Sequence, residues 1–207
     1  MAAVNPFREI DGAPGVFTTG RTLMTVNSVR DTEVYGERLV EFQDVQYRAW
    51  DPGRSKLAAL ILLGGRDLGI DRSSQVLYLG AASGTTASHV SDIVSSGMVY
   101  CVEVSQRSFR DLVGVCERRK NMIPIMADAS RPDEYAHMVE DVDFVYQDIA
   151  QRDQVEIFSR NLDRFGVDRG ILMLKSRSVD VNRDPWQIFA SVRKELVAKG
   201  LGVRQTV

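Results

Sequence analysis

The chain has 207 residues, of which 44% are hydrophobic and 26% are charged. These proportions are typical of an ordinary globular protein and exclude a disordered chain. With 26 basic and 28 acidic residues the formal net charge is −2, which excludes a protein that coats nucleic acid through bulk charge. At this length one sizeable core can form, so we expect one domain with a small appended subdomain.

The sequence indicates neither a membrane protein nor a zinc protein. It has no apolar run of about 18 residues that would span a bilayer, and its start lacks the basic and apolar regions of a signal peptide. We therefore expect a cytoplasmic protein with no membrane partner. Cys101 and Cys116 form no CxxC pair, and His89 and His137 lie far apart, which argues against a zinc cluster.

The first 52 residues predict a small β-rich subdomain. Short stretches rich in Thr, Val and Tyr are separated by turns that contain Gly or Asp. They cover residues 15–27, 32–42 and 45–50. This pattern is typical of a meander of antiparallel strands. A helical pattern with Ser55 as its candidate cap begins after Pro52, so we place a second domain at residues 53–207.

The second domain predicts a doubly wound α/β fold. Five short, almost continuously apolar runs alternate with amphipathic stretches of helical length. The runs are residues 75–80, 98–104, 122–128, 142–148 and 170–176. Because parallel strands need crossover connections, this order indicates a mostly parallel sheet with helices on both faces.

The residues at the strand ends are the candidates for chemistry, because open α/β sheets bind ligands beyond the carboxyl ends of their strands. The first strand leads into small residues from Gly80 to Gly84, where the backbone can approach a ligand closely and a helix begins. The other predicted strands end in charged residues. These are Glu103, Asp128, Asp148 and Lys175.

This set of residues favours a ligand that contains adenosine. Glu103 ends the second strand, where a carboxylate can accept hydrogen bonds from both ribose hydroxyls. That feature does not separate NAD from S-adenosylmethionine. The loop at Gly80 has GxxxG spacing in place of the GxGxxG that holds a diphosphate, and Asp128 suits an adenine amino group. Both observations favour an S-adenosylmethionine methyltransferase over a nicotinamide enzyme.

Lys175 and the histidines require separate interpretations. Lys175 follows the apolar run GILML, where an unpaired buried ammonium group would be costly, so we expect it in the crevice beside Asp148. The alternative is a structural ion pair at a sheet edge. We expect His89 to pack or cap on a helix and His137 to be solvated.

Three segments resemble signature segments of the fibrillarin family, whose members are guide-RNA-directed ribose 2′-O-methyltransferases. They are residues 78–92 (YLGAASGTTASHVSD), 146–151 (YQDIAQ) and 54–59 (RSKLAA). The resemblance covers essentially the whole chain, and the first segment is highly specific. It implies a Rossmann-like methyltransferase fold with a small N-terminal antiparallel β subdomain. The chain starts directly with its β region, as in the archaeal form.

The resemblance also implies a set of site residues. Those that would hold S-adenosylmethionine are Gly80, Ala82, Thr85, Thr86, Glu103, Val104, Asp128, Ala129, Asp148, Ile149, Ala150 and Gln151. The implied catalytic residues are Lys56, Asp148 and Lys175. We expect Lys175, flanked by the other two, to orient the ribose 2′-hydroxyl and to take or polarise its proton.

The resemblance further implies a ribonucleoprotein particle that modifies rRNA and tRNA. Its members would be a Nop-type scaffold protein, an L7Ae-like kink-turn-binding protein and a box C/D guide RNA. Four arginines flank the segments that form the crevice and are candidates for RNA contact. They are Arg21, Arg54, Arg177 and Arg183.

The sequence departs from the family pattern at two places. Val104 stands where the family commonly has an aromatic residue, which predicts weaker stacking on the adenine. The family also continues past the equivalent of Val207 into a final pair of strands, whose histidine is a fourth catalytic residue. Compared with the family pattern we therefore expect either a truncated or a divergent sequence, and a non-catalytic or impaired scaffold-binding subunit is the alternative function. A third reading is a stand-alone S-adenosylmethionine enzyme that acts on a small molecule.

Overall fold

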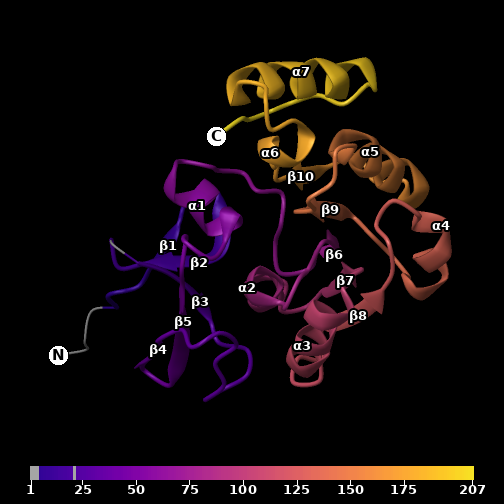
Figure 1. Cartoon of the computed structure of the whole chain (residues 1–207). Coiled ribbons are helices and arrows are strands. Elements are labelled where there is room, and N and C mark those ends of the chain that lie inside the picture. The colour runs from indigo at the N-terminus through magenta and orange to yellow at the C-terminus, as the bar shows by residue number, and fades with distance from the viewer. Residues whose placement is uncertain (1–4, 21) are drawn as a thin grey trace.

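Two five-stranded sheets organise the chain in the computed structural model, which describes residues 5–20 and 22–207 (Figure 1). The first sheet is antiparallel, in the order β1-β2-β3-β5-β4. Its strands are β1 (Arg8–Ile10), β2 (Ala13–Thr18), β3 (Leu23–Val26), β4 (Leu39–Phe42) and β5 (Val45–Trp50). The antiparallel prediction is confirmed, although β1 had not been predicted.

The first sheet differs from a simple meander in two respects. Strand β5 lies between β3 and β4, so the β4–β5 hairpin joins the sheet through its second strand. The residues before β4 form a loop, not the predicted strand. There the Glu37 carboxylate accepts hydrogen bonds from the main-chain N–H groups of Val34 and Tyr35, at 2.8 to 3.0 Å. These local bonds take main-chain groups that strand pairing would have used.

The second sheet is parallel throughout, in the order β10-β9-β6-β7-β8, and confirms the doubly wound fold. Its strands are β6 (Gln75–Leu79), β7 (Met98–Glu103), β8 (Met122–Met126), β9 (Phe144–Gln147) and β10 (Gly170–Leu172). Strand β10 is shorter than predicted because Lys175 already caps the next helix. From the central β6 the chain continues to β7 and β8 and then crosses to β9 and β10 on the other side. The order therefore reverses between β6 and β9, where ligands of such sheets bind.

Helices cover both faces of the second sheet. They are α1 (Lys56–Leu62), α2 (Thr85–Ile93), α3 (Gln106–Cys116), α4 (Pro132–Tyr135), η1 (Ala136–Met138), α5 (Gln154–Phe165), α6 (Ser176–Val179) and α7 (Pro185–Ala198). On β6, Val76 and Tyr78 pack in a cluster with α1, α2 and α3, whereas Leu77 and Leu79 pack with α4 and α5. This alternation follows from the two-residue period of a strand. None of the helices in the described ranges is long and apolar enough to cross a bilayer.

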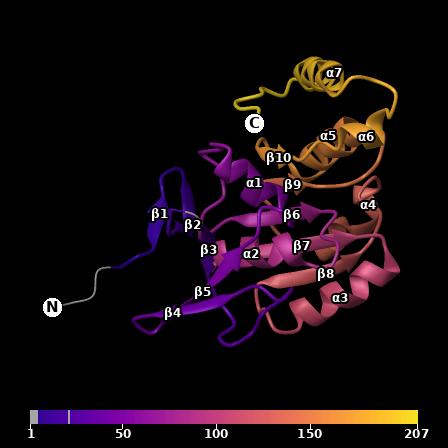
Figure 2. The ribbon, with the colours of Figure 1, turned by 60° about the vertical axis from the view of Figure 1, so that its left-hand side comes forward.

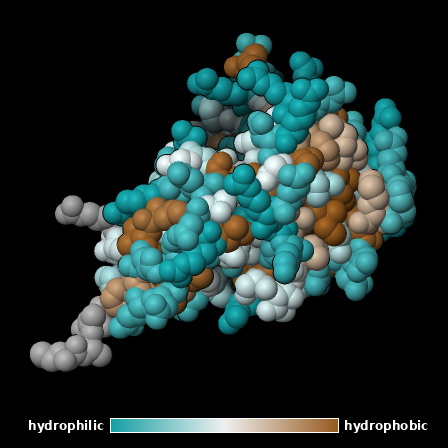
Figure 3. Space-filling model, turned by 90° about the horizontal axis from the view of Figure 1, so that it is seen from below, coloured by the Kyte–Doolittle hydropathy of each residue, from teal (hydrophilic) through white to brown (hydrophobic). Residues whose placement is uncertain are grey.

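The first sheet packs against α1 and α2 and shares their apolar cluster, through residues such as Val16 and Trp50. In the turned view of Figure 2 this sheet lies on the N-terminal side of the molecule, beside α1 and α2. The surface seen from below is mostly hydrophilic, with apolar residues in separate patches (Figure 3). The shared core joins the two sheets. Because the core is shared, the boundary between two domains at residue 52 stays a prediction from the sequence.

Buried charges also join the first sheet to α2. Arg48 on β5 donates to Asp92 at 2.9 Å and to Glu37 at 2.7 Å, and all three side chains are buried. Arg119, which follows α3, donates to the other oxygen of Asp92 at 2.6 Å. Arg48 also donates to the Ser88 hydroxyl. Asp92 is therefore held by two arginines from different parts of the chain.

His89 is fully buried on α2, which confirms that it packs, while His137 is exposed as expected. The ring nitrogens of His89 lie 2.8 Å from the hydroxyls of Thr25 and Tyr35, and its ring stacks on Trp50. Burial holds the pKa of His89 well below 6.5, and the charges of Arg48 and Arg119 lower it further. The folded protein thus holds this ring neutral.

This burial predicts a pH dependence of stability. Below about pH 6.5 His89 takes up a proton in the unfolded chain but not in the folded one, so the free energy of unfolding falls as the pH falls, by up to ~1.4 kcal/mol per pH unit. His89→Gln removes this contribution, and the exposed His137→Gln retains it. Urea unfolding at several pH values measures the slopes. Equal slopes for His89→Gln and the wild type would contradict the expectation.

Candidate functional site

Two lysines share one carboxylate at the carboxyl edge of the second sheet. Lys56 Nζ lies 2.7 and 2.9 Å from the two oxygens of Asp148. Lys175 Nζ lies 2.9 Å from Asp148 Oδ1 and 3.0 Å from the main-chain oxygen of the same residue. The prediction that Asp148 is the partner of Lys175 is confirmed. With all three groups ionised the cluster carries one net positive charge, and its side chains are partly open to solvent.

Three different elements bring this cluster together. Lys56 is the first residue of α1, whose N-cap Ser55 accepts a hydrogen bond from the Ala58 N–H, as its sequence position predicted. Asp148 directly follows β9, and Lys175 is the N-cap of α6. The Thr86 hydroxyl, at the start of α2, bonds to Ser55 at 3.0 Å. This bond ties α2 to the residue next to Lys56.

The loop between β6 and α2 packs closely against the main chain that follows β9. Gly80 has a φ of +82°, and a Cβ placed there would lie 2.6 Å from the main-chain oxygen of Asp148. Only glycine fits this position. Ala82 has a φ of +48°, and the N-cap of α2 is Gly84, so no side-chain cap is present among the described residues. The first N–H groups of α2, at Thr85 and Thr86, are therefore open to a polar or anionic group.

Glu103, the last residue of β7, binds the main chain of the same loop. One of its carboxylate oxygens accepts a hydrogen bond from the Ala82 N–H at 2.8 Å, and the other accepts from the Ser105 N–H at 2.7 Å. The side chain is nearly buried, with 9% of its surface exposed. It therefore supports the positive φ of Ala82 and keeps further acceptor sites for hydroxyl groups.

Asp128 follows β8 and is held as a carboxylate. The Ser130 N–H donates to it at 2.9 Å, and this hydrogen bond, together with those from the Ser130 and Gln151 side chains, keeps its pKa below the usual 3.8. Gln151 thereby reaches Asp128 from the segment after β9. Ala129 is buried, and its carbonyl accepts a hydrogen bond from Asn161.

The remaining predicted site residues differ in exposure. Val104 is 59% exposed just beyond the end of β7, where a flat ligand could lie on it. Ala150 is exposed, whereas Ile149 is buried and packs in the core under Gly80. From Ile149 only the main chain is available to a ligand. The structure thus gathers the predicted residues at one edge, with Ile149 in a packing position.

Several buried polar residues beneath the site had not been predicted. Tyr78 and Tyr146 lie side by side with ring centroids 4.4 Å apart, and burial raises the pKa of both well above 10. Gln147 and Gln154 are also buried. The strand pattern indicates that residues 78, 146 and 147 are buried, but it does not indicate which polar groups they meet.

The arginines named for RNA contact are placed unevenly. Arg21 lies outside the described residues. Arg54 lies over the Tyr35 ring, 5.7 Å from its centroid, and is largely exposed. Arg177 and Arg183 are exposed, and neither makes an ion pair within residues 5–20 and 22–207. Both belong to the segment of α6 and α7 that follows Lys175.

A family model described as Fibrillarin matches residues 9–207. The chain belongs to the fibrillarin family. It is 49% identical over 199 residues to a fibrillarin-like rRNA/tRNA 2′-O-methyltransferase of Methanothermobacter thermautotrophicus, which covers 95% of this chain and 88% of that protein. The resemblance read from the three signature segments is confirmed.

Solved fibrillarin structures share the fold. The Aeropyrum pernix fibrillarin, in complex with natively bound S-adenosyl-L-methionine, aligns with a TM-score of 0.85 at 38% identity and covers 100% of this chain and 94% of that one. A fibrillarin/Nop5p complex aligns with a TM-score of 0.82 at 42% identity, over 92% of this chain and 88% of that one. The predicted methyltransferase fold with an antiparallel N-terminal sheet is thereby confirmed.

Proposed function

We propose that this fibrillarin transfers a methyl group from S-adenosylmethionine to the ribose 2′-hydroxyl of rRNA and tRNA. The observation that carries the proposal is the Lys56–Asp148–Lys175 cluster beside the Gly80–Gly84 loop. The activity named for the Methanothermobacter relative supports it. Binding of S-adenosyl-L-methionine by the Aeropyrum fibrillarin supports the cofactor.

The residues at the edge of the second sheet fit this cofactor. Glycine at position 80 lets the loop after β6 pack against the main chain of Asp148, and the uncapped start of α2 at Thr85 and Thr86 suits the carboxylate of an amino acid. Glu103 would accept from the ribose, with Val104, Asp128 and Ala129 at the base. Ala82 and residues 148–151 would complete the site. When bound, the cofactor supplies a methyl group on a positively charged sulfur.

The chain's own residues would then direct the acceptor hydroxyl. In the transfer a bond forms between the 2′-oxygen and the methyl carbon, the carbon–sulfur bond breaks, and the hydroxyl loses its proton. Lys175 takes or polarises that proton, while Asp148 and Lys56 hold the lysine in place. Positioning supplies much of the rate, because attack must be in line with the departing sulfur.

The partners proposed for this fibrillarin are those of a guide-RNA particle. A box C/D guide RNA would select the nucleotide, and a Nop-type scaffold protein would hold the enzyme together with an L7Ae-like kink-turn-binding protein. The fibrillarin/Nop5p complex supports the scaffold partner. Arg54, Arg177 and Arg183 would contact RNA phosphates, because base pairing with the guide supplies the sequence information.

Calorimetric titration with S-adenosylmethionine tests the cofactor site first. Glu103→Ala removes the acceptor of the Ala82 N–H and the proposed ribose contact, so we expect the dissociation constant to rise about 10- to 100-fold, as for lost hydrogen bonds to a charged group. Glu140→Ala, in an exposed loop, is the matched control. NAD should give no heat of binding. Binding of NAD in place of S-adenosylmethionine would contradict the assignment.

A methyl-transfer assay in the reconstituted guide particle tests the reaction. Transfer to the guided 2′-hydroxyl by the wild-type chain supports the enzyme. Binding to the Nop-type protein without any transfer would instead favour the alternative of a non-catalytic or impaired scaffold-binding subunit. The intact cluster at Asp148 favours the first outcome.

A further inference from the structure

We infer that Gln154, together with Gln147, is a positioning residue that fixes Lys175 against Asp148. The inference rests on the proposed function, because it concerns how the lysine of that site is held. Neither glutamine is among the residues assigned to the cofactor or to the proton. Both are buried, with 1% of Gln154 and 0% of Gln147 exposed.

Gln154 binds the main chain of Lys175 on both sides. Its Oε1 accepts a hydrogen bond from the Lys175 N–H at 2.9 Å, and its Nε2 donates to the Lys175 carbonyl at 3.1 Å. Nε2 also donates to the Gln151 carbonyl at 2.8 Å. One amide thus replaces the two hydrogen bonds that a neighbouring strand would give to residue 175.

Lys175 needs this support because regular structure ends before it. Strand β10 pairs with β9 only as far as Leu172, and the last ladder-like bond is from the Met173 N–H to the Gln147 carbonyl. Helix α6 begins after Lys175 and has only four residues, with no side-chain cap. Within the described chain, the Lys175 N–H has Gln154 as its acceptor.

Gln147 closes the arrangement into a ring. Its Nε2 donates to the Gln154 carbonyl at 2.7 Å, and the next residue in the chain is Asp148. Asp148 in turn accepts from Lys175 Nζ through a side-chain and a main-chain oxygen. The ring runs from Asp148 through Gln147 and Gln154 to Lys175 and back. It sets the position of the lysine backbone relative to the carboxylate that its side chain must reach.

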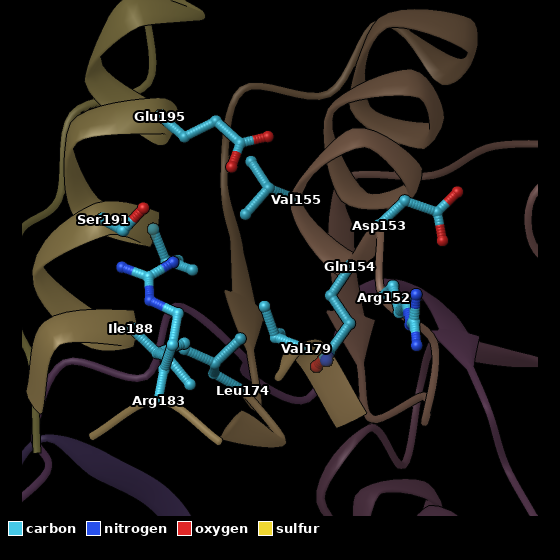
Figure 4. A pocket seen from close by; sticks show the side chains of 11 residues that line it. Arg152, Asp153, Gln154, Val155, Leu174, Val179, Arg183, Ile188, Ser191 and Glu195 are labelled. Atoms are coloured by element: carbon cyan, nitrogen blue, oxygen red, sulfur yellow. The ribbon is translucent and has the colours of Figure 1, made fainter. Parts of the chain in front are cut away.

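The space beside Gln154 leaves room for a side chain of similar size. The residue lies at the start of α5, beside a small cavity of about 60 Å³ between α5 and α7. Figure 4 shows its side chain reaching from α5 toward Val179 of α6, with Leu174 on the other side of the cavity. The lining near the amide is partly apolar. A methionine of similar length can therefore occupy the same place.

The test compares Gln154→Met with Gln46→Met in the reconstituted guide particle. Gln46 is a buried glutamine of the first sheet, bonded to Asn27 and Asp31, so both substitutions remove a buried amide. We expect Gln154→Met to lower kcat about 10- to 100-fold, as misplacement of a reacting group does, with the dissociation constant for S-adenosylmethionine within about twofold of wild type. Gln46→Met should keep kcat while the protein is folded.

Gln154→Glu adds a readout that a purely structural role would not move. The carboxyl keeps an acceptor for the Lys175 N–H but, when ionised, faces the carbonyls of Lys175 and Gln151 without a donor. Burial favours its protonated form as the pH falls. We therefore expect the ratio of its kcat to that of the wild type to rise as the pH is lowered. If Gln154→Met does not fold, this variant carries the test.

The outcomes separate the inference from the proposed function. An active wild type with kcat unchanged in Gln154→Met, or with no pH-dependent recovery in Gln154→Glu, overturns the positioning role and leaves the proposed function intact. A wild-type chain that binds the scaffold but transfers no methyl group overturns the proposed function itself. A lowered kcat at unchanged cofactor affinity, with Gln46→Met at the wild-type rate, supports the inference.

Discussion

Replacing Lys175 with Met is expected to reduce methyl transfer by about 10²- to 10⁴-fold, the usual contribution of a positioned proton-transfer group. The substitution keeps a side chain of similar length and removes the ammonium group that pairs with Asp148. Cofactor binding should stay within about twofold of wild type, because no predicted cofactor contact of this residue is lost. Single-turnover transfer of a labelled methyl group to guided RNA measures the effect.

Lys199→Met is the matched control for this variant. Lys199 pairs with Glu156, away from Asp148, and has the same exposed fraction as Lys175, 29%. Its substitution should leave the rate of transfer unchanged. A Lys175→Met enzyme that retains at least about a third of the wild-type rate would sink the assignment of the proton-handling group, because loss of such a group costs at least about 10²-fold.

Arg48→Met is expected to lower the free energy of unfolding by about 3–5 kcal/mol, the cost of removing one partner from a buried ion pair. Glu37 then loses its arginine, and Asp92 loses one of the two arginines that pair with it. Urea unfolding at a fixed pH measures the loss. The exposed pair of Arg30 with Glu41 provides the comparison, since Arg30→Met should cost less than ~1 kcal/mol. Similar losses in the two variants would show that the buried pair adds little.

The parallel sheet and most of the site could be predicted because both depend on local pattern. Five apolar runs with polar ends fix the strands, and parallel strands bring their carboxyl ends to one edge. The pairing of Lys175 with Asp148 followed from the cost of burying an unpaired charge beside a carboxylate of the next strand. The small residues after β6 predicted close approach of the backbone to a ligand, whereas at Gly80 the structure shows close packing against the main chain of Asp148.

The contacts that could not be predicted join residues far apart in the chain. Arg48 and Asp92 are separated by 44 positions, and their pairing depends on how β5 packs on α2. The role of Gln154 likewise depends on the point at which β10 ends. The Glu37 carboxylate accepts hydrogen bonds from main-chain N–H groups of the loop before it, although the composition of this segment favoured a strand.

The anchoring of Asp92 by Arg48 and Arg119 has a consequence at the other end of α2. Because buried ion pairs and the Ser88 hydroxyl hold the helix, it cannot slide or rotate about its axis without breaking them. The open N–H groups at Thr85 and Thr86 are therefore preorganised before any ligand arrives. A ligand that binds there costs the protein little conformational entropy, so its affinity depends mainly on its own desolvation and on the quality of its hydrogen bonds.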